Sequence, residues 1–211
     1  DGSITSARIE CRYNAGAFPG MWGMLGGMTA WACYDLPNCK SIGIDVVTNR
    51  PKVAAYRAPS APMMAFGVES TLDILAAKLD MDPVELRLKN VAREGTRASY
   101  GPTYGPIGIE PTLEAVRDHP QMNIKLGENQ GRGMACGFWF NIGGQTCVDL
   151  NIGVDGTVSL AQGTVDVGGA RASMGLIAAE ELGIPYDQVK TNIADTASLG
   201  HTDTTEGSRG T

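Results

Sequence analysis

One arginine stands in a run of small residues and prolines that is suited to form a binding loop. Arg57 lies in the middle of residues 53–62, whose sequence is VAAYRAPSAP. Because the two prolines bias the residues before them towards extended backbone, we expect a loop here rather than a helix. A guanidinium group is always charged and could stabilise an oxyanion or a carboxylate. The alternative is a structural salt bridge of Arg57, for instance to Glu69 or Asp73.

A second candidate is the glycine pair Gly168-Gly169, which is followed by Ala170 and lies between a predicted strand and a predicted helix. Backbone without side chains can approach a ligand closely, and the first N–H groups of a helix can bind an anion such as a phosphate. The alternative is a tight strand-to-helix turn without a ligand, because short glycine motifs are weak evidence by themselves.

Three consecutive aromatic residues, Phe138, Trp139 and Phe140, form a third candidate. Aromatic side chains can clamp a flat heteroaromatic ring by offset stacking. A cluster of this kind beside a strand is also typical of a protein interior, so core packing is the alternative.

A pair of helices is predicted to hold the arginine loop. Five apolar residues recur on one face of the first helix: Met64, Val68, Leu72, Leu75 and Leu79. The next helix begins with Asp82 as N-cap, Pro83 at the first helical position and Glu85 as the glutamate of a capping box. The loop is therefore expected to lie on two packed helices.

The remaining elements predict a mixed α/β chain of the α+β class. Residues 8–13 and 41–46 alternate as strands, and residues 18–27 form a connection rich in glycine and methionine. A hairpin is expected around Asp155-Gly156, followed by a helix over 172–182, with Met174, Ile177, Ala178 and Leu182 on one face, and a strand over 189–193. Since residues 120–132 lack periodicity, we place a subdomain boundary near Gly127, between 1–126 and 127–211.

Composition narrows the class of protein. The 211 residues are 43% hydrophobic with a net charge of −6, and their basic residues are scattered, which argues against a nucleic-acid surface. No stretch approaches the roughly 20 apolar residues of a membrane span. Five widely spaced cysteines and two isolated histidines predict neither a disulfide framework nor a metal cluster. We expect free thiols in a reducing compartment, the cytoplasm.

Three segments together resemble one family of enzymes. They are the arginine loop with its helix pair (residues 56–90), the run Asp166–Arg171, and Asp195-Thr196 followed by Glu206–Arg209. In order and spacing they are similar to the molybdenum-binding large subunit of the xanthine dehydrogenase family of molybdenum hydroxylases. The resemblance implies parts of two molybdopterin-binding subdomains, each a β-sheet with packed helices.

The resemblance also implies roles for the candidate residues. Tyr56, Arg57 and Ala58 would contact the cofactor, with Arg57 beside the metal centre. Gly168, Gly169 and Ala170 would contact the pterin, and Gly207 and Ser208 would donate hydrogen bonds to the pterin or its dinucleotide phosphate, a loop cap being the alternative for these two. Phe138 and Trp139 would wall the substrate pocket.

Two positions depart from relatives within the family. Gly169 stands where related sequences often place a glutamine that reaches a molybdenum oxo ligand, so only backbone contact is expected from it. Ala58 stands where the carbon monoxide dehydrogenases carry a copper-binding cysteine. Because alanine has no thiolate to hold copper, carbon monoxide oxidation by that mechanism is disfavoured.

The resemblance implies molybdopterin with molybdenum as the cofactor, in the cytosine dinucleotide form, and [2Fe–2S] and FAD subunits or domains as electron-transfer partners in an oligomer. The substrate would be an N-heterocycle or an aldehyde, oxidised with water-derived oxygen. A reductive relative acting on an aromatic thioester, and a non-catalytic anion-binding or assembly module, are the alternatives. The family's catalytic glutamate and first glycine-rich cofactor loop are not recognisable here, so we interpret the chain as an internal fragment of the subunit.

Overall fold

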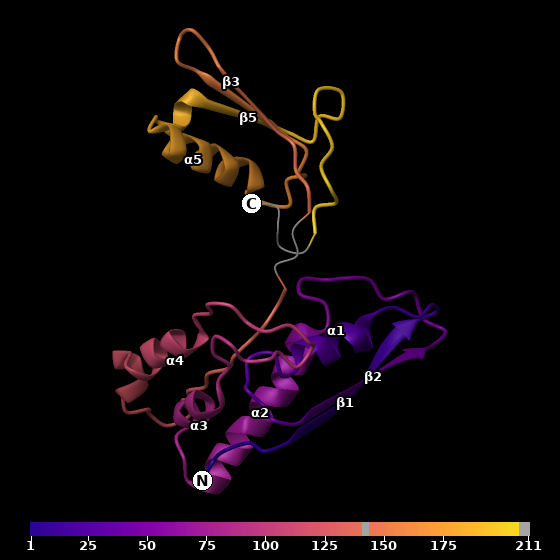
Figure 1. Cartoon of the computed structure of the whole chain (residues 1–211), viewed down its shortest axis with the longest axis vertical. Helices are drawn as coiled ribbons and strands as arrows, with labels where there is room; N and C mark the ends of the chain where they lie inside the picture. Colours follow the sequence, from indigo (N-terminus) through magenta and orange to yellow (C-terminus); the bar gives the residue numbers. More distant parts are fainter. Residues whose placement is uncertain (141–143, 207–211) are drawn as a thin grey trace. The chain divides into compact units, whose positions relative to one another are not determined.

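The computed structural model describes residues 1–140 and 144–206, and the chain divides into two compact units, Asp1–Trp139 and Phe140–Thr211 (Figure 1). Each unit combines a β-sheet with packed helices, which confirms the predicted mixed α/β class. Residues 127–139, which the sequence analysis assigns to the second subdomain, lie in the first compact unit. A compact unit does not define a family subdomain, so the boundary at 126/127 stays a prediction.

The sheet of the first unit has two parallel strands, β1 (Ala7–Gly16) and β2 (Cys39–Val47). Both were predicted from their alternation. The glycine- and methionine-rich connection between them contains a helix, α1 (Trp22–Thr29), which the sequence analysis missed. A side chain at Gly43 of β2 would lie 2.1 Å from the carbonyl oxygen of Gly23 in α1, so glycine at this contact lets the helix lie directly on the strand.

Three further helices complete the first unit: α2 (Ala61–Leu79), α3 (Pro83–Asn90) and α4 (Ile109–Arg117), followed by a short 3₁₀ turn over Pro120–Asn123. The buried line of α2 contains Met64, Val68, Leu72 and Ala76. Leu75 and Leu79 were predicted to share it, but they are 38% and 45% exposed, so that part of the prediction is wrong.

The predicted start of α3 is confirmed. The Asp82 side chain accepts hydrogen bonds from the amides of Val84 and Glu85 at 2.8 and 3.2 Å, and Pro83 occupies the first helical turn. The Glu85 carboxylate, expected to complete a capping box, lies 3.7 Å from Arg117 of α4. The Asp82 cap fixes where the chain turns from α2 into α3.

The second unit contains a three-stranded sheet in the order β3 (Val148–Ile152), β4 (Val158–Gln162) and β5 (Val189–Ile193). The strands β3 and β4 are antiparallel and confirm the hairpin, whose turn places Gly156 at φ 83°. The parallel pair of β4 and β5 is connected through α5 (Ala170–Leu182) and a 3₁₀ turn over Tyr186–Gln188.

The helix α5 ends at Gly183, which has φ 65°, as predicted. Met174 and Ala178 of α5 are buried against Val158, Leu160 and Val189 of the sheet. Ile177 and Leu182, expected on the same face, are 50% and 40% exposed. The core of this unit therefore lies between α5 and the strands β4 and β5.

Candidate functional site

The arginine loop of the first unit has an unusual backbone. Tyr56 is 86% exposed, and the three residues Arg57, Ala58 and Ser60 have φ values of 22°, 52° and 69°. Positive φ is sterically disfavoured for residues with a side chain, and such strained positions gather at functional sites. Ala58 was expected to be extended because it precedes proline. That expectation is wrong, and the loop is a turn in which the Ala61 amide donates to the Ala58 carbonyl at 3.1 Å.

The surrounding structure holds this turn. Ser60 is buried, and its carbonyl accepts from the Met64 amide of α2 at 3.2 Å and from the Tyr13 hydroxyl of β1 at 3.5 Å. Burial raises the pKa of Tyr13 to about 12, so its hydroxyl stays protonated and able to donate at neutral pH. Residues from β1 and α2 thus fix the end of the loop, while Tyr56 and Arg57 lie exposed.

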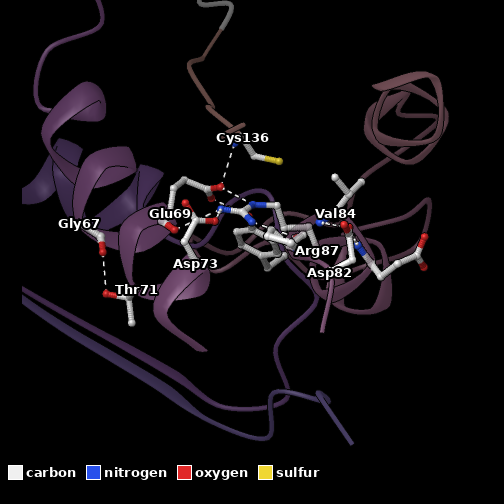
Figure 2. A network of polar contacts seen from close by, with 11 residues as sticks. Gly67, Glu69, Thr71, Asp73, Asp82, Val84, Arg87 and Cys136 are labelled. Atoms are coloured by element: carbon white, nitrogen blue, oxygen red, sulfur yellow. Dashed lines mark hydrogen bonds and ion pairs between the residues drawn. The ribbon is translucent and has the colours of Figure 1, made fainter. Parts of the chain in front are cut away.

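The proposed salt bridge from Arg57 to Glu69 or Asp73 is not formed. Both carboxylates instead bind Arg87 of α3, at 2.7 Å for Glu69 and 2.8 Å for Asp73 (Figure 2). Among the residues that the structure describes, Arg57 makes no ion pair. Its charge is therefore available to a ligand, whereas Arg87 has the structural role that the sequence analysis considered for Arg57.

Glu69 lies at the centre of a buried network, and its carboxylate accepts three hydrogen bonds. The donors are the Tyr34 hydroxyl at 2.5 Å, Nε of Arg87 at 2.7 Å and the Cys136 amide at 2.9 Å. Burial by itself lowers the pKa of Arg87, but the hydrogen bond and charge of Glu69 outweigh it and the pKa is raised. Burial also raises the pKa of Tyr34, so the phenol remains a donor.

The aromatic candidates lie just after Cys136. The ring of Phe138 is tilted against that of Tyr100 with centroids 5.6 Å apart, and Phe138 also packs against the main core cluster. Phe138 and Trp139 are both half-buried. Phe138 therefore contributes to the interior on one side, and neither residue is fully enclosed by the first unit.

In the second unit, Gly168 and Gly169 form the expected turn before α5, with φ values of 115° and 90°. The Asp166 carboxylate accepts from the amides of Gly168 and Ala170, each at 3.1 Å. The N–H of Ala170, the first of the helix and a candidate for binding an external anion, is therefore bound by the protein's own carboxylate, as is the N–H of Gly168. Apart from the neighbouring residues in the chain, no atom of residues 1–140 and 144–206 lies within 4 Å of where a side chain would begin at either glycine, so these residues leave the backbone at this turn open to approach.

Comparison with known proteins identifies this framework. The family model described as "Molybdopterin cofactor-binding domain" matches residues 1–91, and a second model of the same description matches residues 110–211. The chain is 32% identical to the xanthine dehydrogenase molybdenum-binding subunit of Escherichia coli over 158 residues, which are 68% of this chain and 21% of that protein. This chain belongs to the xanthine dehydrogenase family, in its molybdopterin-binding part.

Two aldehyde oxidoreductases agree with the assignment. The one from Megalodesulfovibrio gigas is 25% identical over 99% of this chain and 25% of its own length. The solved structure of the one from Desulfovibrio desulfuricans has a TM-score of 0.76 and 26% identity, over 96% of this chain and 24% of that chain. The chain therefore has the fold of molybdopterin-binding domains, and it spans about a fifth to a quarter of the length of these relatives.

A hollow of this member of the xanthine dehydrogenase family lies beside Asp195 and Thr196. These two residues line the hollow, of about 260 Å³, in the second unit, together with Gly163, Gly200 and His201. The hydrogen bond from the Ser198 hydroxyl lowers the pKa of Asp195. The hollow was not predicted from the sequence, because it forms where Gly163 meets the segment 194–202. Gly207 and Ser208 lie outside the described residues.

The structure describes all five cysteines as free thiols. Across residues 1–140 and 144–206, no three His, Cys, Asp or Glu side chains are grouped closely enough to hold a metal ion. The helices found in those ranges include none of sufficient length and apolarity for a membrane span.

Proposed function

We propose that the protein to which this chain belongs binds molybdopterin as the cytosine dinucleotide and hydroxylates an N-heterocycle or an aldehyde with oxygen derived from water. The observation that carries the proposal is the arginine loop. The loop exposes Tyr56 and Arg57, and its backbone is strained at Arg57, Ala58 and Ser60. It precedes α2 within the segment that matches a molybdopterin cofactor-binding domain. Strain of this kind is retained where a fixed backbone shape is needed for a ligand.

The residues present fit such a cofactor. Tyr56 and Arg57 are exposed and Ala58 is partly exposed, so the loop that they form is accessible to a cofactor. The turn at Gly168 and Gly169 is proposed as a further cofactor contact. The flanking Ala170, and Gly207 with Ser208 near the end of the chain, are proposed to complete these contacts. When bound, the cofactor supplies the redox chemistry, while the protein positions it.

Arg57 is proposed to act directly on the substrate. It is exposed, and it has no ion-pair partner among the residues described. A guanidinium group in this position can stabilise negative charge that develops on an oxygen atom of the substrate, or hold a carboxylate of the substrate in place.

Phe138 and Trp139 are proposed to flank the substrate. Both are half-buried, and the tilted contact of Phe138 with Tyr100 holds one ring of the pair. A flat heteroaromatic or aromatic substrate would gain from stacking on such rings. We further propose iron–sulfur and FAD subunits or domains as electron acceptors, within an oligomer in the cytoplasm.

The test uses the full-length protein. Molybdenum and the released nucleotide are measured first, and dye reduction is then screened across purines, nicotinate-like heterocycles and aldehydes. Stoichiometric molybdenum with substrate-dependent dye reduction is expected. Molybdenum with reduction of an aromatic thioester would favour the reductive relative, and absence of molybdenum from protein matured with its cofactor supply would favour a non-catalytic module.

A further inference from the structure

We infer that Glu69 is a positioning residue that fixes the segment carrying Phe138 and Trp139 onto the helix that carries the arginine loop. The inference rests on the proposed function, which places these two aromatic residues beside the substrate. The contact in question is the hydrogen bond from the backbone amide of Cys136 to Glu69. The ion pair between α2 and α3 does not require this hydrogen bond.

The contact joins a helix to a segment without regular secondary structure. Glu69 lies in the middle of α2, whereas residues 131–140 form no helix or strand. The Cys136 amide donates to Oε2 of Glu69 at 2.9 Å, only two residues before Phe138 (Figure 2). A segment without regular structure depends on such side-chain contacts for its backbone position.

Burial makes this contact strong. The side chain of Glu69 is 6% exposed, and its Oε2 accepts from both Arg87 and Cys136. A hydrogen bond to a charged acceptor in a buried site is stronger than one between neutral groups. The Cys136 amide would lose a buried acceptor if Glu69 were apolar, and the segment would lose a fixed point next to Phe138.

The ion pair of Arg87 does not depend on Glu69 alone. Arg87 also binds Asp73 at 2.8 Å, the Pro83 carbonyl at 3.0 Å and the backbone carbonyl of Glu69 at 3.1 Å. The contacts with Asp73 and with the Glu69 carbonyl join α2 to α3, and they remain when the Glu69 side chain is changed. A variant at Glu69 can therefore release the aromatic segment while α2 and α3 stay together.

Three variants of the full-length enzyme separate the roles. In Glu69→Gln, the amide oxygen can still accept from Cys136 and Arg87, and the amide NH₂ can donate to the Tyr34 hydroxyl. Glu69→Met has a similar length and no acceptor. Asp73→Asn weakens the ion pair of Arg87 without touching Cys136, so it is the matched control.

Hydrogen–deuterium exchange of peptides covering residues 133–139 is the primary measurement. We expect exchange about tenfold or more faster in Glu69→Met than in the wild type, Glu69→Gln and Asp73→Asn, with α3 unchanged. Unchanged exchange at 133–139 in Glu69→Met would overturn the inference, and so would a uniform increase throughout the first unit. If Glu69→Met fails to fold, the exchange of the Cys136 amide is measured in the wild type. Exchange as fast as in an unprotected peptide would also overturn the inference.

Kinetics separate this inference from the proposed function. For a substrate found in the dye-reduction screen, we expect the KM of Glu69→Met to rise about tenfold with kcat within about threefold, and Glu69→Gln to restore it. Faster exchange with unchanged KM would support Glu69 as the residue that positions the segment and would contradict the pocket role of Phe138 and Trp139.

Discussion

Two arginines of the first unit occupy opposite environments. The Arg87 side chain is fully buried and bound by two carboxylates, whereas Arg57 is exposed in a strained loop and has no ion pair among the described residues. A buried guanidinium contributes to packing and to the geometry of its neighbours. An exposed one on a strained backbone suits contact with a ligand. The same substitution at the two positions should therefore have different effects.

At Arg57, replacement by lysine keeps the charge but removes the planar fork of donors. If Arg57 acts at the site, Arg57→Lys in the full-length enzyme should lower turnover about tenfold or more, which is roughly 1.4 kcal/mol of transition-state stabilisation. The melting temperature should barely move, because no ion pair of Arg57 is broken within the described part of the chain. Turnover per folded molecule and thermal unfolding are the measurements.

Arg87→Lys is the matched control for that prediction. Lysine cannot bind Glu69, Asp73 and the Pro83 carbonyl together, so we expect a loss of about 2–3 kcal/mol in the free energy of unfolding. The reverse pattern, with Arg57→Lys destabilised and fully active per folded molecule, would make Arg57 a structural residue.

At the scale of elements, the two units expose loop backbone to a ligand in different ways. The loop before α2 depends on residues with side chains held at positive φ, whereas the turn before α5 depends on two glycines that adopt it without strain. The Asp166 carboxylate already caps the amides of Gly168 and Ala170. Close backbone approach, rather than a free anion site at the helix N-terminus, is what this turn offers a cofactor.

Gly169→Asp tests that approach. The change adds bulk and a second negative charge beside Asp166, so the full-length enzyme should lose most of its molybdenum if the pterin contacts this turn. The matched control is Gly156→Asp in the hairpin, where φ is 83° and the space beside the glycine is likewise open. Both changes carry a similar backbone cost, about 1 kcal/mol. Equal molybdenum content in the two variants would reduce Gly168-Gly169 to a turn without a cofactor contact.

At the scale of the whole molecule, each unit has its own hydrophobic core. The first is built around α2 and the second around α5 and the strands β4 and β5. The exposed apolar residues of β3, Val148, Leu150 and Ile152, leave part of the second sheet uncovered within the described residues. A strand edge and an apolar face of this kind favour self-association.

We predict that the 211-residue chain, produced alone, folds but retains no molybdenum and oxidises no substrate. The chain spans about a fifth to a quarter of its relatives, and a buried dinucleotide needs contacts from several segments to offset the cost of ordering it. Metal analysis, pterin fluorescence and dye reduction on the purified chain are the measurements. Stoichiometric molybdenum, or any substrate-dependent turnover, would contradict the prediction.

The sequence by itself determined the elements that depend on near neighbours. The Asp82-Pro83 start of α3, the hairpin at Asp155-Gly156 and the glycine end of α5 were all predicted correctly. Each is specified by backbone preferences and hydrogen bonds within a few residues, and such local terms can be interpreted without a fold. The order of the motifs likewise indicated the family, which the comparisons confirmed.

Only the tertiary structure decided which groups meet. Glu69 contacts Tyr34, 35 residues before it, and Cys136, 67 residues after it, and no local pattern indicates either pair. Proline at position 59 favours an extended Ala58, yet the contacts of Ser60 with Tyr13 and α2 hold the turn at positive φ. Long-range packing and buried hydrogen bonds outweighed local preference at these positions, because the folded chain brings distant partners within bonding distance.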